Sequence, residues 1–181
     1  MKFPDICSRQ HVKPAGKRMN KIYPFGADGR LIITKAALRT MTAHSQLADS
    51  QPESGGVLLG RHLIDSCDIV IDEVTTPQAT DKRKRFSFFR SLSHNKKVKQ
   101  RWNETNGTSA YLGLWHTHPE AVPTPSTTDL NDWNKASKND EYEGDSLFFI
   151  IVGMKEIGVW FKSRLGVIQQ LQLKIESNEK R

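Results

Sequence analysis

The sequence predicts a single α+β domain, in which a mixed β-sheet is flanked by helices. The chain has 181 residues, which is the usual length of one domain. Strand-like segments occur singly or in groups of two or three between helical segments, an order more typical of an α+β fold than of a regular doubly wound sheet. No G-x-G-x-x-G or P-loop pattern is present, so nucleotide-cofactor binding has no support in the sequence.

The composition is typical of a soluble globular protein. Hydrophobic residues make up 36% of the chain and charged residues 26%, and no apolar run approaches the ~18 residues of a membrane-spanning helix. Cys7 and Cys67 are too few for a disulfide framework or a four-cysteine zinc site. The N-terminus lacks the apolar segment of a secretion signal. We therefore expect a reducing, cytoplasmic compartment in which both thiols are free.

The two ends of the chain are expected to lie outside the folded domain. Residues 1–22 are expected to form a basic arm, because residues 1–21 carry a net charge of +5. Residues 176–181 are expected to form a polar tail. The domain itself should then span residues 23–175.

The first half of the domain is expected to contain strands, one helix and one long loop. Thr34 can cap the helix, whose apolar side is formed by Ala37, Leu38 and Met41. Two apolar runs separated by a polar turn predict adjacent strands. In order, the expected elements are a strand at Leu31–Ile33, a helix from Thr34 to about Leu47, strands at Val57–Leu63 and Ile69–Val74, a basic loop at Thr75–Arg85, and a short strand or core anchor at Phe86–Phe89.

The second half is expected to contain two helices and four strands. The first of these helices begins at Ser91 or Ser93. Leu92, Val98 and Trp102 are expected to form its buried side. In order, the expected elements are this helix to Thr105, a strand at Tyr111–His118, a helix from about Thr127 to Ser137, and strands at Leu147–Met154, Gly158–Lys162 and Val167–Lys174.

The positive charge of the chain is concentrated in two segments. Residues 81–101 carry a net charge of +8, and together with residues 1–21 they leave the rest of the chain at −6. Such a distribution can steer a nucleic acid or an acidic protein surface toward one face, but a solvated helix face and a loose arm are the favoured explanation. The segment lacks the interleaved aromatic residues of a base-stacking surface.

Two histidines near the end of one predicted strand suggest a metal site. His116 and His118 are two residues apart, so on a strand both side chains project from the same face, with Leu112 and Leu114 lower on that face. Pro119 then ends the strand. Two imidazoles held side by side in this way are a natural beginning of a metal-binding site.

A helix start follows the histidines after a short loop. Ser126 stands at the predicted N-cap and Asp129 at the third helical position, where its carboxylate can complete the coordination. Two His and one Asp leave a fourth tetrahedral position for water, which is the pattern of a catalytic zinc site. Each piece also has a plainer explanation: an H-x-H arises by chance, and an S-x-x-D capping box is common without any function. The combination carries the prediction.

A hydrolytic site also needs a base, and Glu53 is the candidate. It stands just before Gly55-Gly56 and the apolar run of a strand that should be central in the sheet. From there its carboxylate could reach the end of a neighbouring strand. The plainer alternative is an exposed loop glutamate.

These residues resemble the pattern of the JAMM metallopeptidases, which are also called JAB or MPN-type zinc isopeptidases. That pattern is an upstream Glu, then H-x-H, seven residues, Ser, two residues and Asp. Glu53, His116, His118, Ser126 and Asp129 stand at its five positions, and a GGVLLG sequence follows the glutamate much as it does in the family.

The resemblance covers roughly residues 30–165 and implies a fold, a metal and roles. The fold would be the JAB/MPN fold, a cytidine-deaminase-like sandwich. The two histidines and Asp129 would hold one catalytic Zn²⁺, and Glu53 would act as general base on a water molecule. Ser126 would help to stabilise the oxyanion and also cap its helix.

The detailed likeness is to small prokaryotic JAB proteins, including those of CBASS anti-phage operons. Phe86 and the segment Tyr111–Pro119 carry it. This branch implies an isopeptidase that removes a cGAS-like nucleotidyltransferase from its targets and works opposite an E1/E2-like ligase. The expected partner is a protein conjugate with an extended C-terminal tail, and no membrane partner is expected. Thr75–Arg85 and Lys138–Asp145 are the candidate segments for gripping the tail.

The sequence leaves two other functions open. A JAB peptidase that processes a sulfur-carrier or ubiquitin-like precursor would use the same catalytic residues. A non-catalytic module that binds nucleic acid or protein would use residues 81–101 instead. A zinc deaminase is disfavoured because no P-C-x-x-C occurs, and the HEXXH motif of another metalloprotease class is also absent.

Overall fold

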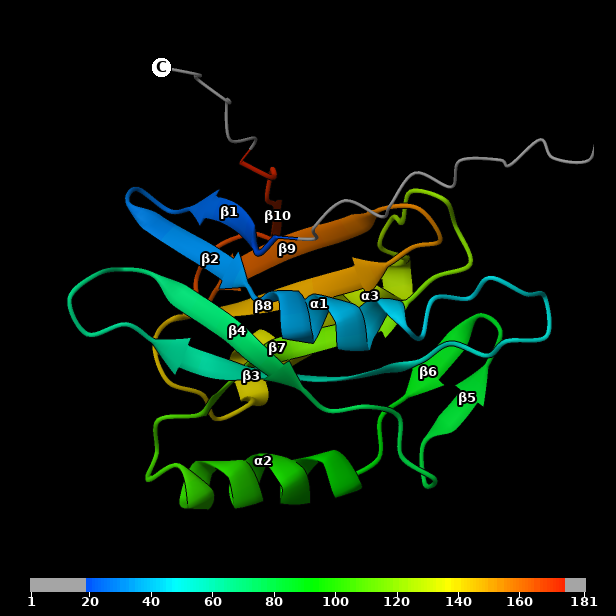
Figure 1. The fold of residues 1–181 in the computed structure, drawn as a ribbon, viewed down its shortest axis with the longest axis horizontal. Helices are drawn as coiled ribbons and strands as arrows, with labels where there is room; N and C mark the ends of the chain where they lie inside the picture. Colours follow the sequence, from blue (N-terminus) through cyan, green and yellow to red (C-terminus); the bar gives the residue numbers. More distant parts are fainter. Residues whose placement is uncertain (1–18, 175–181) are drawn as a thin grey trace, which may run out of the picture.

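The structure, a computed structural model, describes residues 19–174 of the chain. An eight-stranded mixed sheet organises this part (Figure 1). The elements in this part are β1 (Lys21–Phe25), β2 (Gly29–Ile33), α1 (Lys35–Thr42), β3 (Gly55–His62), β4 (Ile69–Val74), β5 (Lys82–Lys84), β6 (Ser87–Phe89), α2 (Ser93–Glu104), β7 (Ala110–Thr117), α3 (Thr127–Asn139), β8 (Ser146–Val152), β9 (Ile157–Ser163) and β10 (Gln169–Gln170). None of these helices combines the length and hydropathy needed to cross a membrane.

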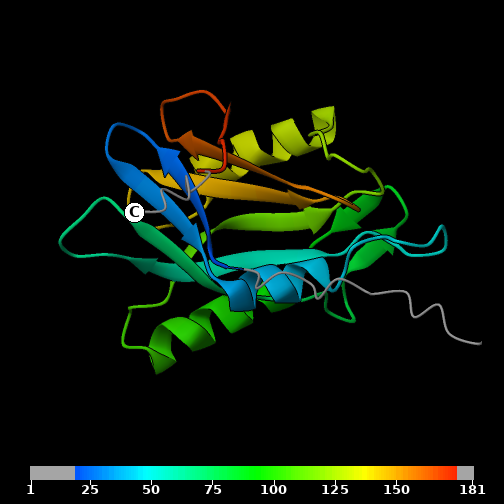
Figure 2. The same ribbon diagram turned by 45° about the horizontal axis from the view of Figure 1, so that its top comes forward.

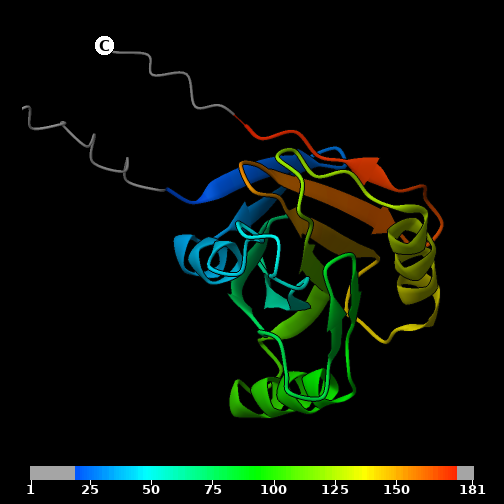
Figure 3. The ribbon, with the colours of Figure 1, turned by 90° about the vertical axis from the view of Figure 1, so that its right-hand side faces the viewer.

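The sheet is mixed and curled, with helices on both sides. Its strand order is β1-β2-β4-β3-β7-β8-β9-β10, and β5 pairs with β6 in a separate hairpin. β2 pairs with β4 and β7 with β8 in parallel, and the other neighbouring strands are antiparallel. α1 and α3 lie on opposite faces, and α2 packs against β3 and β7 (Figures 2 and 3). The predicted α+β class is confirmed.

Each face of the sheet has its own apolar cluster. On the α1 side, Met41 is buried in the same cluster as Leu58 and Phe148. On the α3 side, Trp133 stacks on Phe149 with ring centroids 4.7 Å apart. All seven residues of β8 are buried, as expected of a strand covered on both faces. β8 therefore gives its parallel neighbour β7, which carries His116, a rigid support.

An irregularity in β7 decides which side chains face the histidines. The pairing of β7 with β3 skips Leu112, which is the extra residue of a β-bulge. Gly113 beside it has φ of +138°, a conformation that favours glycine. Leu112 therefore joins the α1-side cluster, whereas Leu114 lies on the α3 side with His116. The expectation that Leu112 shares a face with the histidines is wrong, because it assumed a regular strand.

The ends of the domain differ in detail from the expectation. β1 begins at Lys21, which lies inside the expected arm of residues 1–22, because this segment pairs with β2. Residues 1–18 of the expected arm lie outside the described residues. The expected tail of residues 176–181 lies outside them as well. The expected last strand, Val167–Lys174, is reduced to the two residues of β10.

The first helix is shorter than the prediction. α1 ends at Thr42, whereas the sequence pattern extends it to about Leu47. The residues that follow turn inward, so that Gln46 is 1% exposed. Its side-chain amide bonds to residues far away in the chain. A tertiary contact of this kind overrides local helix preference.

The second helix packs through a polar side chain. The expectation that Leu92, Val98 and Trp102 form its buried side is wrong for Leu92, which is 79% exposed, and for Trp102, which is 38% exposed, whereas Val98 is half-buried. The one α2 residue that is buried is His94, at 0%. Its two ring nitrogens are hydrogen-bonded to Thr75 and Asp81, so a hydrogen-bonded network replaces the expected apolar contact.

Candidate metal centre

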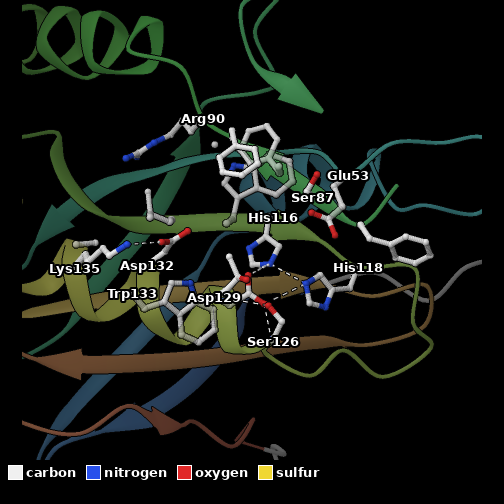
Figure 4. Close-up of a pocket in the computed structure, with 18 of the residues that line it drawn as sticks. Glu53, Ser87, Arg90, His116, His118, Ser126, Asp129, Asp132, Trp133 and Lys135 are labelled. Atoms are coloured by element: carbon white, nitrogen blue, oxygen red, sulfur yellow. Dashed lines mark hydrogen bonds and ion pairs between the residues drawn. The ribbon is translucent and has the colours of Figure 1, made fainter. Parts of the chain in front are cut away.

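The two histidines of the H-x-H sequence meet at one point (Figure 4). His116 stands near the end of β7, and His118 follows directly after that strand. Their Nε2 atoms are 3.0 Å apart. The backbone N–H of His118 donates to the carbonyl of Val152 at 3.0 Å, which holds this residue beside the end of β8. The structure thus brings the two rings together, as strand alternation predicts.

Asp129 reaches the histidines from the first turn of α3. Its Oδ1 lies 3.1 Å from His116 Nε2, and its Oδ2 lies 3.4 Å from His118 Nε2. The Ser126 N–H donates to Asp129 Oδ2 at 2.6 Å, and the Asp129 N–H donates to Ser126 Oγ at 3.2 Å. The capping box is therefore complete. It also orients the carboxylate that faces the histidines.

The three side chains fit a divalent metal ion. One ligand atom from each lies within 4.8 Å of the other two. With zinc–ligand bonds of about 2.0–2.1 Å in a tetrahedron, neighbouring ligand atoms are about 3.3–3.4 Å apart. The two Nε2 atoms are 3.0 Å apart, and each lies near a different oxygen of Asp129, His116 at 3.1 Å from Oδ1 and His118 at 3.4 Å from Oδ2, which is close to that spacing. Two imidazole nitrogens and a carboxylate oxygen, without a thiolate, are typical donors for a catalytic zinc ion.

The charges of the cluster favour a cation between these atoms. Burial raises the pKa of Asp129, but hydrogen bonds from His116 and His118 outweigh it and hold that pKa well below its usual range. Burial lowers the pKa of His118, yet the Asp129 carboxylate outweighs this effect and raises it overall. The carboxylate therefore stays ionised and stabilises positive charge beside the two rings.

Glu53 lies next to this cluster, just before β3. Gly55 pairs with His116 across β3 and β7, and Figure 4 shows the Glu53 carboxylate turned toward the histidines. Glu53 is only 5% exposed, so the alternative of an exposed loop glutamate is wrong. Burial raises its pKa to about 7; His118 acts in the opposite direction and Asp129 adds to the rise. A carboxylate with such a pKa suits proton transfer near neutral pH.

A groove of about 720 Å³ contains the cluster. One wall consists of residues 86–90, in and beside β6, and the other wall is α3 with Asp132. β7 forms the floor, to which it contributes Leu114 and His116. Phe86 and Phe89 are 74% and 59% exposed, so the β6 wall presents aromatic surface to solvent.

The segments expected to grip a tail match the groove only in part. Among the described residues, Thr75–Arg85 contributes none to the lining. The wall is made by the residues that follow it, because β5 and β6 form a hairpin that the polar sequence did not predict. From Lys138–Asp145, Asn139 and Asp140 line the groove.

Polar residues that the sequence did not predict also surround the cluster. Glu120 Oε2 lies 3.8 Å from His118 Nδ1, where a carboxylate can orient a ligand imidazole. Gln46 accepts from the Thr117 hydroxyl at 2.9 Å, and Arg83 donates to the Glu53 carbonyl at 2.7 Å. Only Glu120 had a signal, its place directly after H-x-H-P. The others belong to no local spacing.

The fold agrees with comparisons to known proteins. Residues 34–163 match the prokaryotic homologs of the JAB domain, and the chain belongs to this family. The solution structure of a protein from Desulfitobacterium hafniense is similar in fold, with a TM-score of 0.53 and 20% sequence identity over 76% of this chain and 87% of that one.

Two curated relatives carry the name CD-NTase/cGAS isopeptidase. The protein of Pseudomonas aeruginosa (strain BWHPSA011 / Pa011) is 37% identical over 127 residues, which is 68% of this chain and 79% of that protein. The protein of Vibrio cholerae serotype O1 (strain ATCC 39315 / El Tor Inaba N16961) is 32% identical over 139 residues, which is 76% of this chain and 85% of that protein.

Proposed function

We propose that this protein is a zinc-dependent isopeptidase that releases a CD-NTase, a cGAS-like nucleotidyltransferase, from molecules joined to its C-terminus. The observation that carries the proposal is the convergence of His116, His118 and Asp129 beside the buried Glu53. Membership of the JAB family and the names of the relatives support the substrate class. The protein would then act in the cytoplasm as a regulator of CBASS anti-phage defence.

The chain's own residues have distinct roles in this reaction. The two histidines and Asp129 would hold Zn²⁺, which supplies Lewis-acid activation of water and of the scissile carbonyl when bound. Glu53 accepts the proton of the attacking water and delivers it to the leaving amine, which its raised pKa permits near pH 7. Ser126 Oγ accepts a hydrogen bond from the Asp129 N–H. The hydroxyl proton of Ser126 can then donate to the developing oxyanion.

The groove supports a substrate that enters as an extended tail. It runs between the exposed aromatic residues of the β6 wall and the polar face of α3. A folded nucleotidyltransferase would remain outside, while its C-terminal tail lies along β7 toward the histidines. This arrangement buries the scissile bond next to Glu53 and excludes bulk water from it.

The test is cleavage of a defined conjugate. A CD-NTase joined through its C-terminus to a lysine side chain is incubated with the zinc-loaded protein, and release of the nucleotidyltransferase is followed by mass spectrometry. We expect release at the C-terminal residue, and loss of release with a chelator. A precursor of a sulfur-carrier or ubiquitin-like protein is incubated in parallel. Cleavage of that precursor alone would replace the proposed substrate with the alternative one.

The nucleic-acid alternative has no specific observation in its favour. In the segment 81–101, Arg85 pairs with Asp49, and Arg101 pairs with Glu73. Part of the positive charge is therefore bound within the protein itself. The remaining exposed lysines on α2 form an ordinary solvated helix face.

A further inference from the structure

We propose that Arg83 is a positioning residue for Glu53 and links the groove wall to the general base. This inference rests on the proposed function and concerns how its base is held. Arg83 stands in β5, the strand that pairs with β6. It does not line the groove, so its guanidinium would act on Glu53 from outside the groove and would not contact the substrate.

The contacts of Arg83 are directed at the segment that carries Glu53. Its Nε donates to the Glu53 carbonyl at 2.7 Å, and its NH2 group donates to the Ser54 hydroxyl. The Glu53 N–H in turn donates to the Lys84 carbonyl at 2.8 Å. Both backbone polar groups of Glu53 are thus bound to β5. The carboxylate is the part of this residue that faces the cluster.

The charge of Arg83 has no carboxylate partner among the described residues. No ion pair includes it, although the neighbouring Arg85 pairs with Asp49. Both of its hydrogen bonds go to neutral oxygens, and they lie in a partly buried place. A guanidinium offers several donors in a fixed fork, so it can bind two adjacent groups of one chain at once. This geometry suits a clamp better than a charge–charge contact.

A buried network behind the clamp fixes the same segment to the histidine strand. The Ser54 N–H donates to the Thr117 hydroxyl at 3.0 Å, and the Thr117 N–H donates to the Ser54 carbonyl at 2.8 Å. Thr117 is the residue between the two histidines. Its hydroxyl donates to Gln46, whose amide group donates to the Arg85 carbonyl at 2.9 Å. The network holds Ser54, and Arg83 completes the hold on Glu53 itself.

The link has a consequence for catalysis. β6, whose residues form one wall of the groove, is the other strand of the hairpin that bears Arg83. A tail seated against that wall therefore rests on the element that holds the base. Loss of the clamp should affect proton transfer and leave tail binding nearly unchanged.

The experiment compares Arg83→Ala, Arg83→Lys and the matched control Arg85→Ala, which removes the same charge two residues away. Cleavage kinetics, zinc content and hydrogen exchange of the Glu53 and Ser54 amides are measured for each. For Arg83→Ala we expect kcat to fall about 10–100-fold, as for other outer-shell partners of a metal site. KM should stay within about threefold, zinc content should be unchanged, and both amides should exchange faster.

The controls separate positioning from other roles. Arg83→Lys should recover part of kcat, and Arg85→Ala should behave as the unaltered protein. The inference is overturned if the loss lies in KM, if Arg85→Ala shows the same loss, or if kcat does not change. If the unaltered protein cleaves no conjugate, the proposed function fails, and hydrogen exchange of the Glu53 and Ser54 amides alone tests the clamp. Faster exchange only in the Arg83 variants supports the clamp. Equal exchange in all variants refutes it.

Discussion

At the scale of single residues, the chemistry depends on where the chain places ordinary side chains. Glu53 would be an unremarked carboxylate in an exposed loop, but burial beside the histidines raises its pKa to about 7. Asp129 responds in the opposite direction, because two imidazoles donate to it. One carboxylate is thus poised to take a proton, while the other stays ionised. This division is the one that a hydrolytic site requires.

Glu53→Gln should separate proton transfer from metal binding. The amide keeps the shape of the side chain but cannot accept the proton of water, so kcat should fall by a factor of about 10²–10⁴. Zinc content, measured by elemental analysis, should match that of the unaltered protein. Asp132→Asn, which alters a carboxylate on the α3 wall, serves as the control and should retain turnover. Normal turnover by Glu53→Gln would remove this residue from the role.

Two substitutions of Ser126 should distinguish its catalytic role from its capping role. Ser126→Ala removes the cap and should lower the free energy of unfolding by about 1 kcal/mol, whereas Ser126→Gly should lower it by only a few tenths. Both remove the hydroxyl donor, so both should lower kcat by about 10²–10³-fold. The measurements are urea denaturation and single-substrate kinetics. If kcat instead falls in step with the free energy of unfolding, so that Ser126→Gly is nearly normal, the hydroxyl only caps the helix.

At the scale of elements, the β5–β6 hairpin is tied to the domain at both ends by one buried network. His94 Nδ1 lies 2.6 Å from Thr75 Oγ1, and His94 Nε2 lies 3.0 Å from Asp81 Oδ2. Asp81 also accepts from the N–H and the hydroxyl of Ser91, which follows β6. The Trp115 indole donates to the Thr75 carbonyl at 2.9 Å. The groove wall is therefore fixed by polar contacts where an apolar core would be the usual solution.

This network predicts an acid dependence of stability. Burial alone raises the pKa of Asp81, but hydrogen bonds from the Gln78 backbone, His94 and Ser91 outweigh it and lower that pKa to about 2. The ordinary value is about 3.9. The ionised carboxylate therefore contributes stability that is present above about pH 4 and lost as pH falls toward 2.

The measurement is the urea midpoint at pH 6, 4 and 2.5. Asp81→Asn should be less stable than the unaltered protein at pH 6 and should lose less further stability on acidification. Asp49→Asn removes an exposed carboxylate with one arginine partner and should follow the unaltered protein. Equal acid dependence in Asp81→Asn and the unaltered protein would contradict the assignment.

At the scale of the whole molecule, local rules predicted the parts and long-range contacts decided the rest. Strand alternation brought the two histidines together, and the capping box placed Asp129, because both rules act within a few residues. The place of Glu53 before Gly55-Gly56 suggested that it could reach a neighbouring strand's end, but only the family resemblance favoured this over an exposed loop glutamate. Its burial could not be predicted from the sequence, since it depends on pairing between β3 and β7.

The features that the sequence did not predict join distant residues. Gln46 and Thr117 are 71 positions apart, and Arg83 and Glu53 are 30 apart. The bulge at Leu112 reverses a strand's alternation, and no turn residue marks it except the glycine beside it. His94 has the pattern of an exposed helix position, yet it is buried because Thr75 and Asp81 satisfy its ring. Polar networks of this kind carry no hydrophobic periodicity.

Zinc should stabilise the whole fold, because the proposed ligands come from the end of β7, from the residue directly after it and from the first turn of α3. At a free zinc concentration about 100-fold above Kd, the free energy of unfolding should rise by about 2.7 kcal/mol, if the unfolded chain does not bind the ion. For a domain of this size that is a rise in Tm of about 5–10 °C. Differential scanning calorimetry with and without a chelator measures it.

The variants of this experiment test the ligand set itself. His116→Ala, His118→Ala and Asp129→Ala should each lose stoichiometric zinc and most of the rise in Tm, because each removes one of three ligands. Asp132→Asn lies on the same helix outside the cluster and should keep both. Glu120→Gln should bind zinc about 10–100-fold more weakly, since it changes the carboxylate beside His118 Nδ1. Stoichiometric zinc and a full rise in Tm in Asp129→Ala would show that α3 does not contribute to the metal centre.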